Sequence, residues 1–272
     1  MTSANLPPSK AAAKSSAPVR VRDLRLDFFR GIAMFIILAA HTPGNFVSNW
    51  IPARFGFSDA TEIFVFCSGM ASAIAFGRGF DTVGWRLGTA RVGFRVWQVY
   101  WAHVGLFFAT IALTVALTNS GFGTRNYWGQ LNLWPVFVES DKWANPDILL
   151  KFMTLGYVPN YFDILPMYMI VLLLLPIIMA LANVNKWLVG AFILTIWLLA
   201  QETLMQVLGL SQFHLSFSAE PWSERQWFFN PFAWQLIFFT GFAFMRGWLP
   251  KPPVNKALVV FAALIVLGNI PL

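Results

Sequence analysis

Residues 20–80 read RVRDLRLDFFRGIAMFIILAAHTPGNFVSNWIPARFGFSDATEIFVFCSGMASAIAFGRGF, a basic segment followed by two apolar runs that a Pro- and Gly-containing loop separates. The first run carries Arg30 and His41, and Asp59 and Glu62 stand at the start of the second. A charged side chain inside an apolar span costs a few kcal/mol, roughly 2.5–3.5 on insertion scales, so such groups generally face a cavity or a partner. We therefore look for the chemistry of this chain in this pair of helices.

The composition predicts an all-α, polytopic transmembrane helical bundle. Of the 272 residues, 57% are hydrophobic and 11% charged, whereas soluble domains contain about 25% charged residues; the mean hydropathy is +0.61. The alternation of apolar and polar residues that is typical of a membrane barrel is missing from the sequence. Apolar runs of about 20 residues can cross a bilayer, and we count about seven of them: 26–43, 59–77, 95–117, 164–183, 187–208, 231–249 and 256–272.

The net charge of +7 indicates topology and gives no reason to expect a nucleic-acid partner. Most Lys and Arg residues fall in segments on one side of the predicted bundle, which the positive-inside rule makes cytoplasmic, together with the N-terminus. Residues 1–18 are rich in Ser, Ala, Pro and Lys, which predicts a disordered cytoplasmic tail. Residues 19–272 then form one integral membrane domain in the lipid bilayer. A cleaved signal peptide is the competing interpretation of the N-terminal segment.

One stripe of the first helix collects polar residues. Steps of three and four residues keep Asp27, Arg30, Met34, Ile37 and His41 on the same helical face. An ion pair between Asp27 and Arg30 at the membrane interface, with His41 at the helix end, is the simplest interpretation. The alternative is that this stripe lines a passage.

Asp59 and Glu62 fit the D-x-x-E spacing of a helix capping box, which explains both of them structurally. Glu62 also lies on the helical face that we expect to point into the bundle near His41. A carboxylate beside an imidazole fixes the ring tautomer and stabilises the imidazolium, as general-base catalysis requires. The sequence leaves both interpretations open.

Small residues mark a helix contact in the second run. Gly69, Ala73 and Gly77 repeat the spacing that lets membrane helices approach closely. Cys67, the one cysteine, is expected to be a small buried apolar residue. P-loop, HExxH, CxxC and GxSxG motifs are missing from the sequence, which argues against ATPases, zinc hydrolases and serine hydrolases and predicts no metal.

Arginines gather after the second run, at Arg86, Arg91 and Arg95. Anionic lipid headgroups are the ordinary partner of such a cluster. However, Arg91, Arg95 and Gln98 continue one face into the next span, where guanidinium groups could hold the phosphates of a cofactor. His103, further along that span, is either a proton carrier or a polar residue that bonds across helices.

The longest loop, 119–162, is rich in aromatic residues, among them Trp128 and Trp134. Such residues form the interfacial belt of membrane proteins, and they are also what a sugar-binding surface uses. Asp163 is placed to cap the helix that follows, and it lies on the side where His41 emerges.

Four runs in this order, RLDFFRGIAMFIILAAHTPGNF, FSDATEIFVFCSGM, RVGFRVWQVYW and YFDILPMYMIVLLLLP, resemble the OpgC family, inner-membrane proteins that succinylate osmoregulated periplasmic glucans. That family is related to the wider group of transmembrane acyltransferases. The resemblance covers most of residues 20–176. It implies a multi-pass protein of the bacterial inner membrane with about ten helices, so this chain is expected to be C-terminally incomplete relative to the family.

The resemblance also implies an acyl-CoA donor, succinyl-CoA, reached from the cytoplasm and a hydroxyl of a periplasmic glucan as acceptor. The family's histidine in the first helix matches His41, its basic residues match Arg91 and Arg95, and its acidic residue matches Asp163. With the reasoning above, the expected roles are catalytic for His41, Glu62 and Asp59, cofactor-binding for Arg91, Arg95, Arg86 and Arg30, and substrate-binding for Asp163, Trp128 and Trp134. A transporter or flippase for a glycan or organic acid, and a non-catalytic relative, are the two alternative functions.

Overall fold

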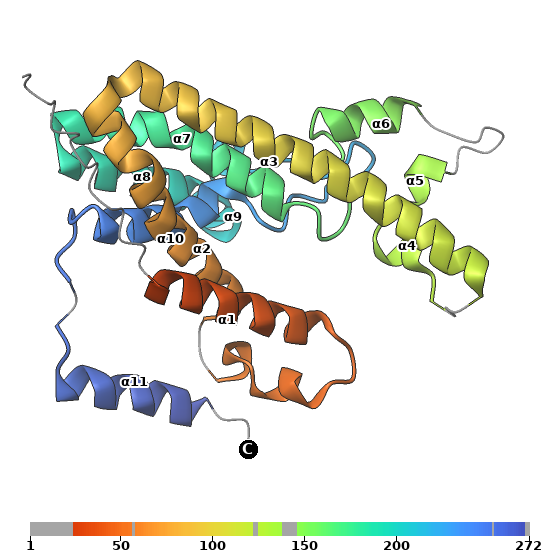
Figure 1. The fold of residues 1–272 in the computed structure, drawn as a ribbon, viewed down its shortest axis with the longest axis horizontal. Helices are drawn as coiled ribbons and strands as arrows, with labels where there is room; N and C mark the ends of the chain where they lie inside the picture. The colour runs from red at the N-terminus through yellow and green to blue at the C-terminus, as the bar shows by residue number, and fades with distance from the viewer. Residues whose placement is uncertain (1–23, 56–57, 122–124, 138–145, 252, 270–272) are drawn as a thin grey trace, which may run out of the picture.

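The computed structural model describes residues 24–55, 58–121, 125–137, 146–251 and 253–269, and they form helices joined by loops (Figure 1). Among these residues there is no strand, only an isolated antiparallel bridge between Ser218 and Gln226. The predicted all-α class is therefore confirmed. The α-helices are α1 (Leu24–His41), α2 (Ala60–Ser72), α3 (Arg78–Ser120), α4 (Tyr127–Gln130), α5 (Trp134–Phe137), α6 (Pro146–Met153), α7 (Ile164–Val184), α8 (Lys186–Leu199), α9 (Glu202–Val207), α10 (Pro231–Met245) and α11 (Lys256–Gly268). Short 3-10 turns η1 (Phe46–Trp50), η2 (Pro52–Arg54) and η4 (Ser211–Phe213) and a π-helical turn η3 (Ala73–Gly77) connect some of them.

The long helix α3 is the axis of the fold, and α7 packs along it (Figure 1). Chain direction changes sharply between α2 and the body of α3, where Gly84 has a φ of 81° inside the helical run. Glycine adopts this conformation without the Cβ penalty of other residues. Next to this corner, the indole Nε1 of Trp85 donates a hydrogen bond to the carbonyl of Pro176 at 3.0 Å, which ties the start of α3 to α7.

The helices α2 and α10 touch backbone to backbone. A Cβ on Gly69 would lie 1.8 Å from the carbonyl oxygen of Phe238, and one on Gly241 would lie 2.2 Å from that of Phe66. Only glycine, whose side chain is a single hydrogen atom, fits such a contact. The close packing predicted from the spacing of small residues is confirmed at Gly69, and Ala73, one helical turn later, is also buried.

An apolar core lies at the end of the molecule that carries the loops. Phe107 of α3 stacks on Phe152 of α6 with ring centroids 3.7 Å apart, and Leu133, Tyr157 and Trp227 from three loop segments are buried with them. This core holds the loops against α3 and α6.

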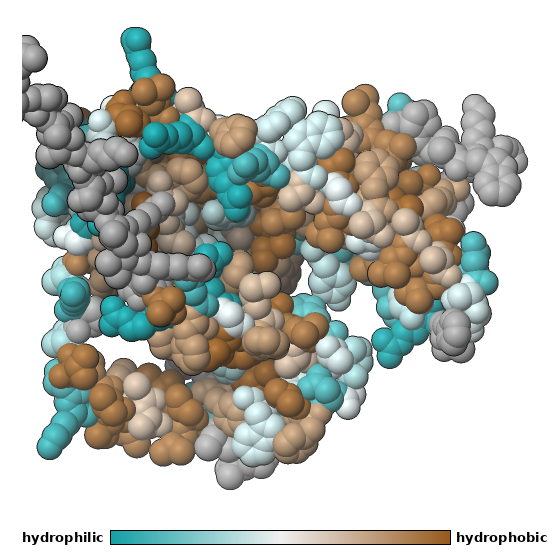
Figure 2. All heavy atoms as spheres, in the orientation of Figure 1, coloured by the Kyte–Doolittle hydropathy of each residue, from teal (hydrophilic) through white to brown (hydrophobic). Residues whose placement is uncertain are grey.

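The helices α1 and α11 are the least enclosed parts of the chain. α1 packs on α2 and buries only Leu26 and Ala33, and α11 buries none of its residues. Figure 2 shows apolar side chains gathered over this part of the surface; Phe35 is 75% exposed and Phe261 62%. Surfaces of this kind suit contact with lipid.

The prediction of about seven membrane spans is not supported. By length and composition, two stretches of the described chain could cross a bilayer: Ala60–Ser120, which contains α2 and α3, and Ile164–Val184. The helices α8, α10 and α11 have 14, 15 and 13 residues, about 20–22 Å at 1.5 Å per residue, whereas the hydrocarbon layer is about 30 Å thick. The helix α1 is 18 residues long but includes three charged residues, Arg25, Asp27 and Arg30, and it is not among these two stretches.

The expected helices nevertheless occur close to the predicted places. The run predicted as 187–208 is interrupted, because α8 ends at Leu199 and α9 begins at Glu202. The predicted tail, residues 1–18, lies outside the described residues.

Candidate functional site

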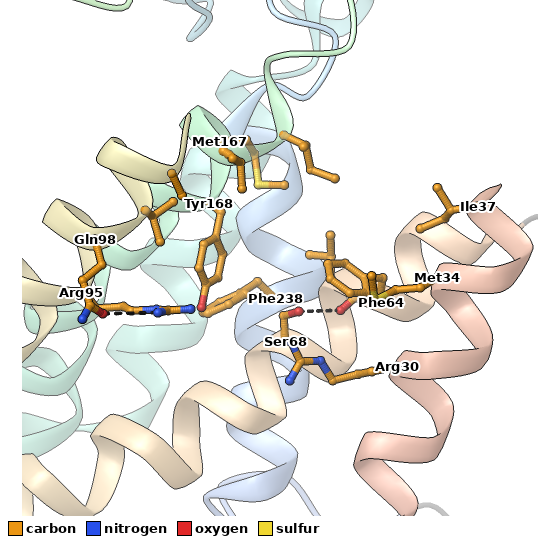
Figure 3. Close-up of a pocket in the computed structure, with 15 residues that line it drawn as sticks. Arg30, Met34, Ile37, Phe64, Ser68, Arg95, Gln98, Met167, Tyr168 and Phe238 are labelled. Atoms are coloured by element: carbon orange, nitrogen blue, oxygen red, sulfur yellow. Dashed lines mark hydrogen bonds between the residues drawn. The ribbon is translucent and has the colours of Figure 1, made fainter. Parts of the chain in front are cut away.

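A cavity of about 440 Å³ lies where α1, α2, α3, α7 and α10 meet (Figure 3). Its walls come from segments far apart in the sequence, so it exists only in the folded chain. Most of its lining is apolar. The residues are Arg30, Met34 and Ile37 of α1, Phe64, Val65 and Ser68 of α2, Arg95, Gln98, Val99 and Ala102 of α3, Ile164, Leu165, Met167 and Tyr168 of α7, and Phe238 of α10.

Two arginines reach this cavity from opposite walls, Arg30 from α1 and Arg95 from α3 (Figure 3). The guanidinium of Arg30 lies over the ring of Phe64, 5.6 Å from its centroid. Arg95 donates from Nη1 to Oε1 of Gln98 at 3.3 Å. None of the described residues that line the cavity carries a carboxylate, so the cavity suits an anionic ligand with an apolar portion.

The other two arginines of the cluster lie elsewhere. Arg86 and Arg91 are exposed on α3, and neither lines the cavity. Arg91 instead borders a shallow depression beside Leu87 and Phe94. The structure therefore brings Arg30 and Arg95 to one site and leaves Arg86 and Arg91 on the surface of α3.

His41 is the last residue of α1 and is exposed. Its Nδ1 lies 2.8 Å from the carbonyl oxygen of Ile37. Because a carbonyl can only accept, Nδ1 carries the proton in this bond, and Nε2 of a neutral ring keeps its lone pair. Ile37 lines the cavity, so the imidazole stands one helical turn, about 6 Å, beyond the lining residue of its own helix.

The capping interpretation of Asp59 and Glu62 is what the structure shows. Oδ1 of Asp59 accepts from the backbone N–H of Ala60 at 2.6 Å, and Oε2 of Glu62 accepts from that of Asp59 at 2.7 Å, which completes a capping box at the start of α2. In the described part of the chain no hydrogen bond joins either carboxylate to His41. The group that orients the imidazole is the Ile37 carbonyl.

Asp163 precedes α7 as predicted, but its side chain does not cap that helix. It is 5% exposed, and its Oδ2 accepts from the backbone N–H of Phe229 at 2.8 Å. The cap prediction is wrong because a backbone donor from the segment before α10 takes this carboxylate.

The two predicted tryptophans have different surroundings. Trp128 stacks on Phe137 at 4.3 Å between centroids. Trp134 is 46% exposed and lies 6.1 Å from the ring of Trp222, a residue of a loop that the sequence did not single out. Trp222 also contacts Tyr157. Trp134 and Trp222 thus form an exposed aromatic surface. The sequence pointed only to Trp134, through the density of tryptophans in its loop.

Below this surface lies a buried polar network that sequence reasoning missed. Glu220 accepts from Arg225 at 3.0 Å, from Ser223 at 2.5 Å and from Asn132 at 2.6 Å. Burial alone would raise the pKa of Glu220, but these hydrogen bonds, that of Arg225 first, outweigh it and hold the pKa below its usual value. Tyr157, which donates to the Asn132 carbonyl, has a raised pKa through burial and the nearby charge of Glu220.

His103 lies in α3 with no exposed surface. Its ring stacks on Phe152 with centroids 4.8 Å apart, and neither ring nitrogen has a hydrogen-bond partner. The predicted hydrogen bond across helices is therefore absent for this residue. Among the described residues, no group of three or more His, Cys, Asp or Glu side chains is arranged to hold a metal ion.

Comparison with known proteins gives a family. No curated protein and no solved structure matches this chain. The model of the family described as OpgC protein matches residues 22–272, which include every helix described above. That match supports an acyltransferase-like role in glucan modification at a membrane. This chain belongs to the OpgC family.

Proposed function

We propose that this chain is a membrane O-acyltransferase that moves a succinyl group from succinyl-CoA to a hydroxyl of a periplasmic glucan. One observation carries the proposal: Arg30 and Ile37 of α1 line a cavity that also contains Arg95, and the same helix ends at an imidazole whose Nε2 is free to accept a proton. A cation that faces the donor, Arg30, and a base for a hydroxyl, His41, thus stand on α1, and α3 supplies the second cation, Arg95.

The donor side uses the arginines. Arg95 holds a phosphate of acyl-CoA, because a guanidinium donates two parallel hydrogen bonds to phosphate oxygens. Arg91 and Arg86 extend this positive surface along the exposed start of α3, where the rest of a nucleotide would lie. The acyl chain enters the apolar cavity, and Arg30 faces it from the opposite wall.

The transfer step needs one base. The sugar hydroxyl gives its proton to Nε2 of His41 while its oxygen attacks the thioester carbonyl, so that a C–O bond forms. The C–S bond then breaks, and the imidazolium returns the proton to the leaving thiolate. Hydrogen bonding to the Ile37 carbonyl keeps Nδ1 protonated throughout, which is the task that a carboxylate performs in other enzymes. Glu62 and Asp59 act indirectly, because their capping box fixes the start of α2.

The acceptor side uses the loop end. Sugar rings present apolar faces that pack on aromatic side chains, and Trp134 offers an exposed one. Asp163 and Trp128 hold the loops below it, through the hydrogen bond to Phe229 and the stacking on Phe137. We place the protein in the bacterial inner membrane as a multi-pass protein, with the arginines of α3 towards the cytoplasm and these loops towards the periplasm, as its charge distribution supports.

The test is the ester content of periplasmic glucans, measured by mass spectrometry in cells that express this chain or a variant. His41→Ala removes the base and is expected to lower succinylation at least a hundredfold, the lower end of what a positioned base contributes. His214→Ala, in the segment between α9 and α10, is the matched control and should leave succinylation unchanged. Equal glucan succinylation by wild type and His41→Ala at equal expression would refute the proposal. Glucan transport into liposomes without ester formation would favour a transporter.

A further inference from the structure

The segment before α7 is fixed from several sides. The backbone N–H of Val158 donates to the Ala219 carbonyl at 2.7 Å, and that of Asn160 donates to the Leu131 carbonyl at 3.1 Å. At the end of the segment, Asp163 is bound to Phe229. The backbone between these anchors therefore has little freedom.

Tyr161 stands in the middle of this segment in an unusual conformation. Its φ is 69°, a left-handed backbone that residues with a Cβ rarely adopt. Its neighbour Phe162 is 5% exposed, but Tyr161 is 68% exposed, so burial does not offset the strain. A strained residue whose surroundings force its conformation is a frequent feature of functional sites.

The exposed ring meets the proposed base. Tyr161 and His41 have ring centroids 5.9 Å apart and planes at 85°. An ordinary interfacial tyrosine requires neither this contact nor a positive φ. Two perpendicular rings form a corner, and the lone pair of Nε2 lies in the plane of the imidazole.

We propose that Tyr161 is the positioning residue for the sugar acceptor, an inference that rests on the proposed function. A pyranose of the glucan packs its apolar face on the phenol ring. Its rim hydroxyls then meet the edge of the perpendicular imidazole, where Nε2 accepts the proton. The fixed segment supplies the acceptor geometry, and α1 supplies the base.

The experiment uses the purified full chain in lipid nanodiscs, with succinyl-CoA and with glucan extracted from cells that lack the protein. Tyr161→Leu keeps an apolar side chain but removes the flat ring. We expect the KM for glucan to rise about tenfold, as the loss of an aromatic contact implies, with the KM for succinyl-CoA within about twofold. Tyr161→Phe should keep the KM for glucan within about threefold of wild type. Phe228→Leu, which removes an aromatic ring that is 80% exposed in the segment before α10, is the matched control and should change neither constant.

Glucan binding without succinyl-CoA, measured by calorimetry, separates this inference from the proposed function. Wild type that binds glucan but forms no ester would refute the transferase, while weaker binding by Tyr161→Leu would still support the positioning role. Equal glucan binding by wild type and Tyr161→Leu, or no binding by wild type, would overturn it. Unfolding midpoints of the variants show whether each is folded, and Tyr161→Gly, which relieves the positive φ, provides a second variant without the ring.

Discussion

Replacing Gly69 by alanine should separate α2 from α10 and damage the cavity that both helices line. The added Cβ would lie 1.8 Å from the carbonyl oxygen of Phe238 and 2.8 Å from its carbonyl carbon. Both atoms belong to the backbone, so no side-chain rotation relieves the clash. The helices must move apart by at least about 1.2 Å to restore a 3.0 Å separation.

The cost follows from two opposing effects. Overpacking a well-packed contact costs about 1–3 kcal/mol, and a clash with backbone belongs at the upper end. Alanine recovers about 1 kcal/mol over glycine inside a helix. The net loss is about 2 kcal/mol, which for a chain of this length lowers the unfolding midpoint by about 4–8 °C.

Gly93→Ala is the matched control, because Gly93 lies in α3 with nothing within 4 Å of its added Cβ. This variant should unfold at the wild-type temperature or slightly above it. Thermal unfolding followed by circular dichroism in detergent measures both. Transfer activity should also fall in Gly69→Ala, since Phe238 and Ser68 line the cavity. An unfolding midpoint of Gly69→Ala within 1 °C of that of Gly93→Ala would refute the reasoning about the helix contact.

Two further predictions concern charges outside the cavity. Because the pKa of Glu220 is lowered in the folded chain, its stabilisation is complete above the ordinary carboxyl pKa of about 4.3 and is lost as the pH falls through the lower folded value; tryptophan fluorescence between pH 7 and 3 should show this loss in wild type and a smaller one in Glu220→Gln. Asp81 accepts from Arg246 at 2.7 and 3.0 Å but is 49% exposed, so Asp81→Asn should cost at most about 1 kcal/mol. A coupling energy clearly above about 1 kcal/mol between Asp81→Asn and Arg246→Gln in a double-mutant cycle would contradict the view that this ion pair is weak.

The helices could be predicted because their signals are local. Each apolar run is one continuous stretch of sequence, and the capping box at Asp59 and Glu62 and the spacing of Gly69 and Ala73 join residues three or four positions apart. The span count failed for the same reason. An apolar run of about 20 residues can continue through a point where the helix ends, as it does after Leu199. A hydropathy average over such a run does not detect a helix break of two residues.

The cavity was only half predictable. The stripe of Arg30, Met34 and Ile37 was visible in the sequence, and these residues do line the cavity. Its other walls depend on which helices meet. No pattern in the sequence separates Arg95, which reaches the cavity, from Arg91 one turn earlier. Tyr161 carried no signal at all, because its interest lies in a backbone angle and a contact with a distant helix.

The two halves of the proposed chemistry are coupled through α1. This helix forms one wall of the cavity but buries only Leu26 and Ala33, so its contact with α2 largely fixes where it stands. Arg30 and His41 lie on this one helix, so a displacement of α1 changes both the position of Arg30 in the cavity and the contact of His41 with Tyr161. Donor binding and acceptor alignment therefore depend on the same helix contact. Gly69→Ala displaces α2, on which α1 packs. This substitution should therefore affect donor binding and acceptor alignment together, although Gly69 touches neither ligand.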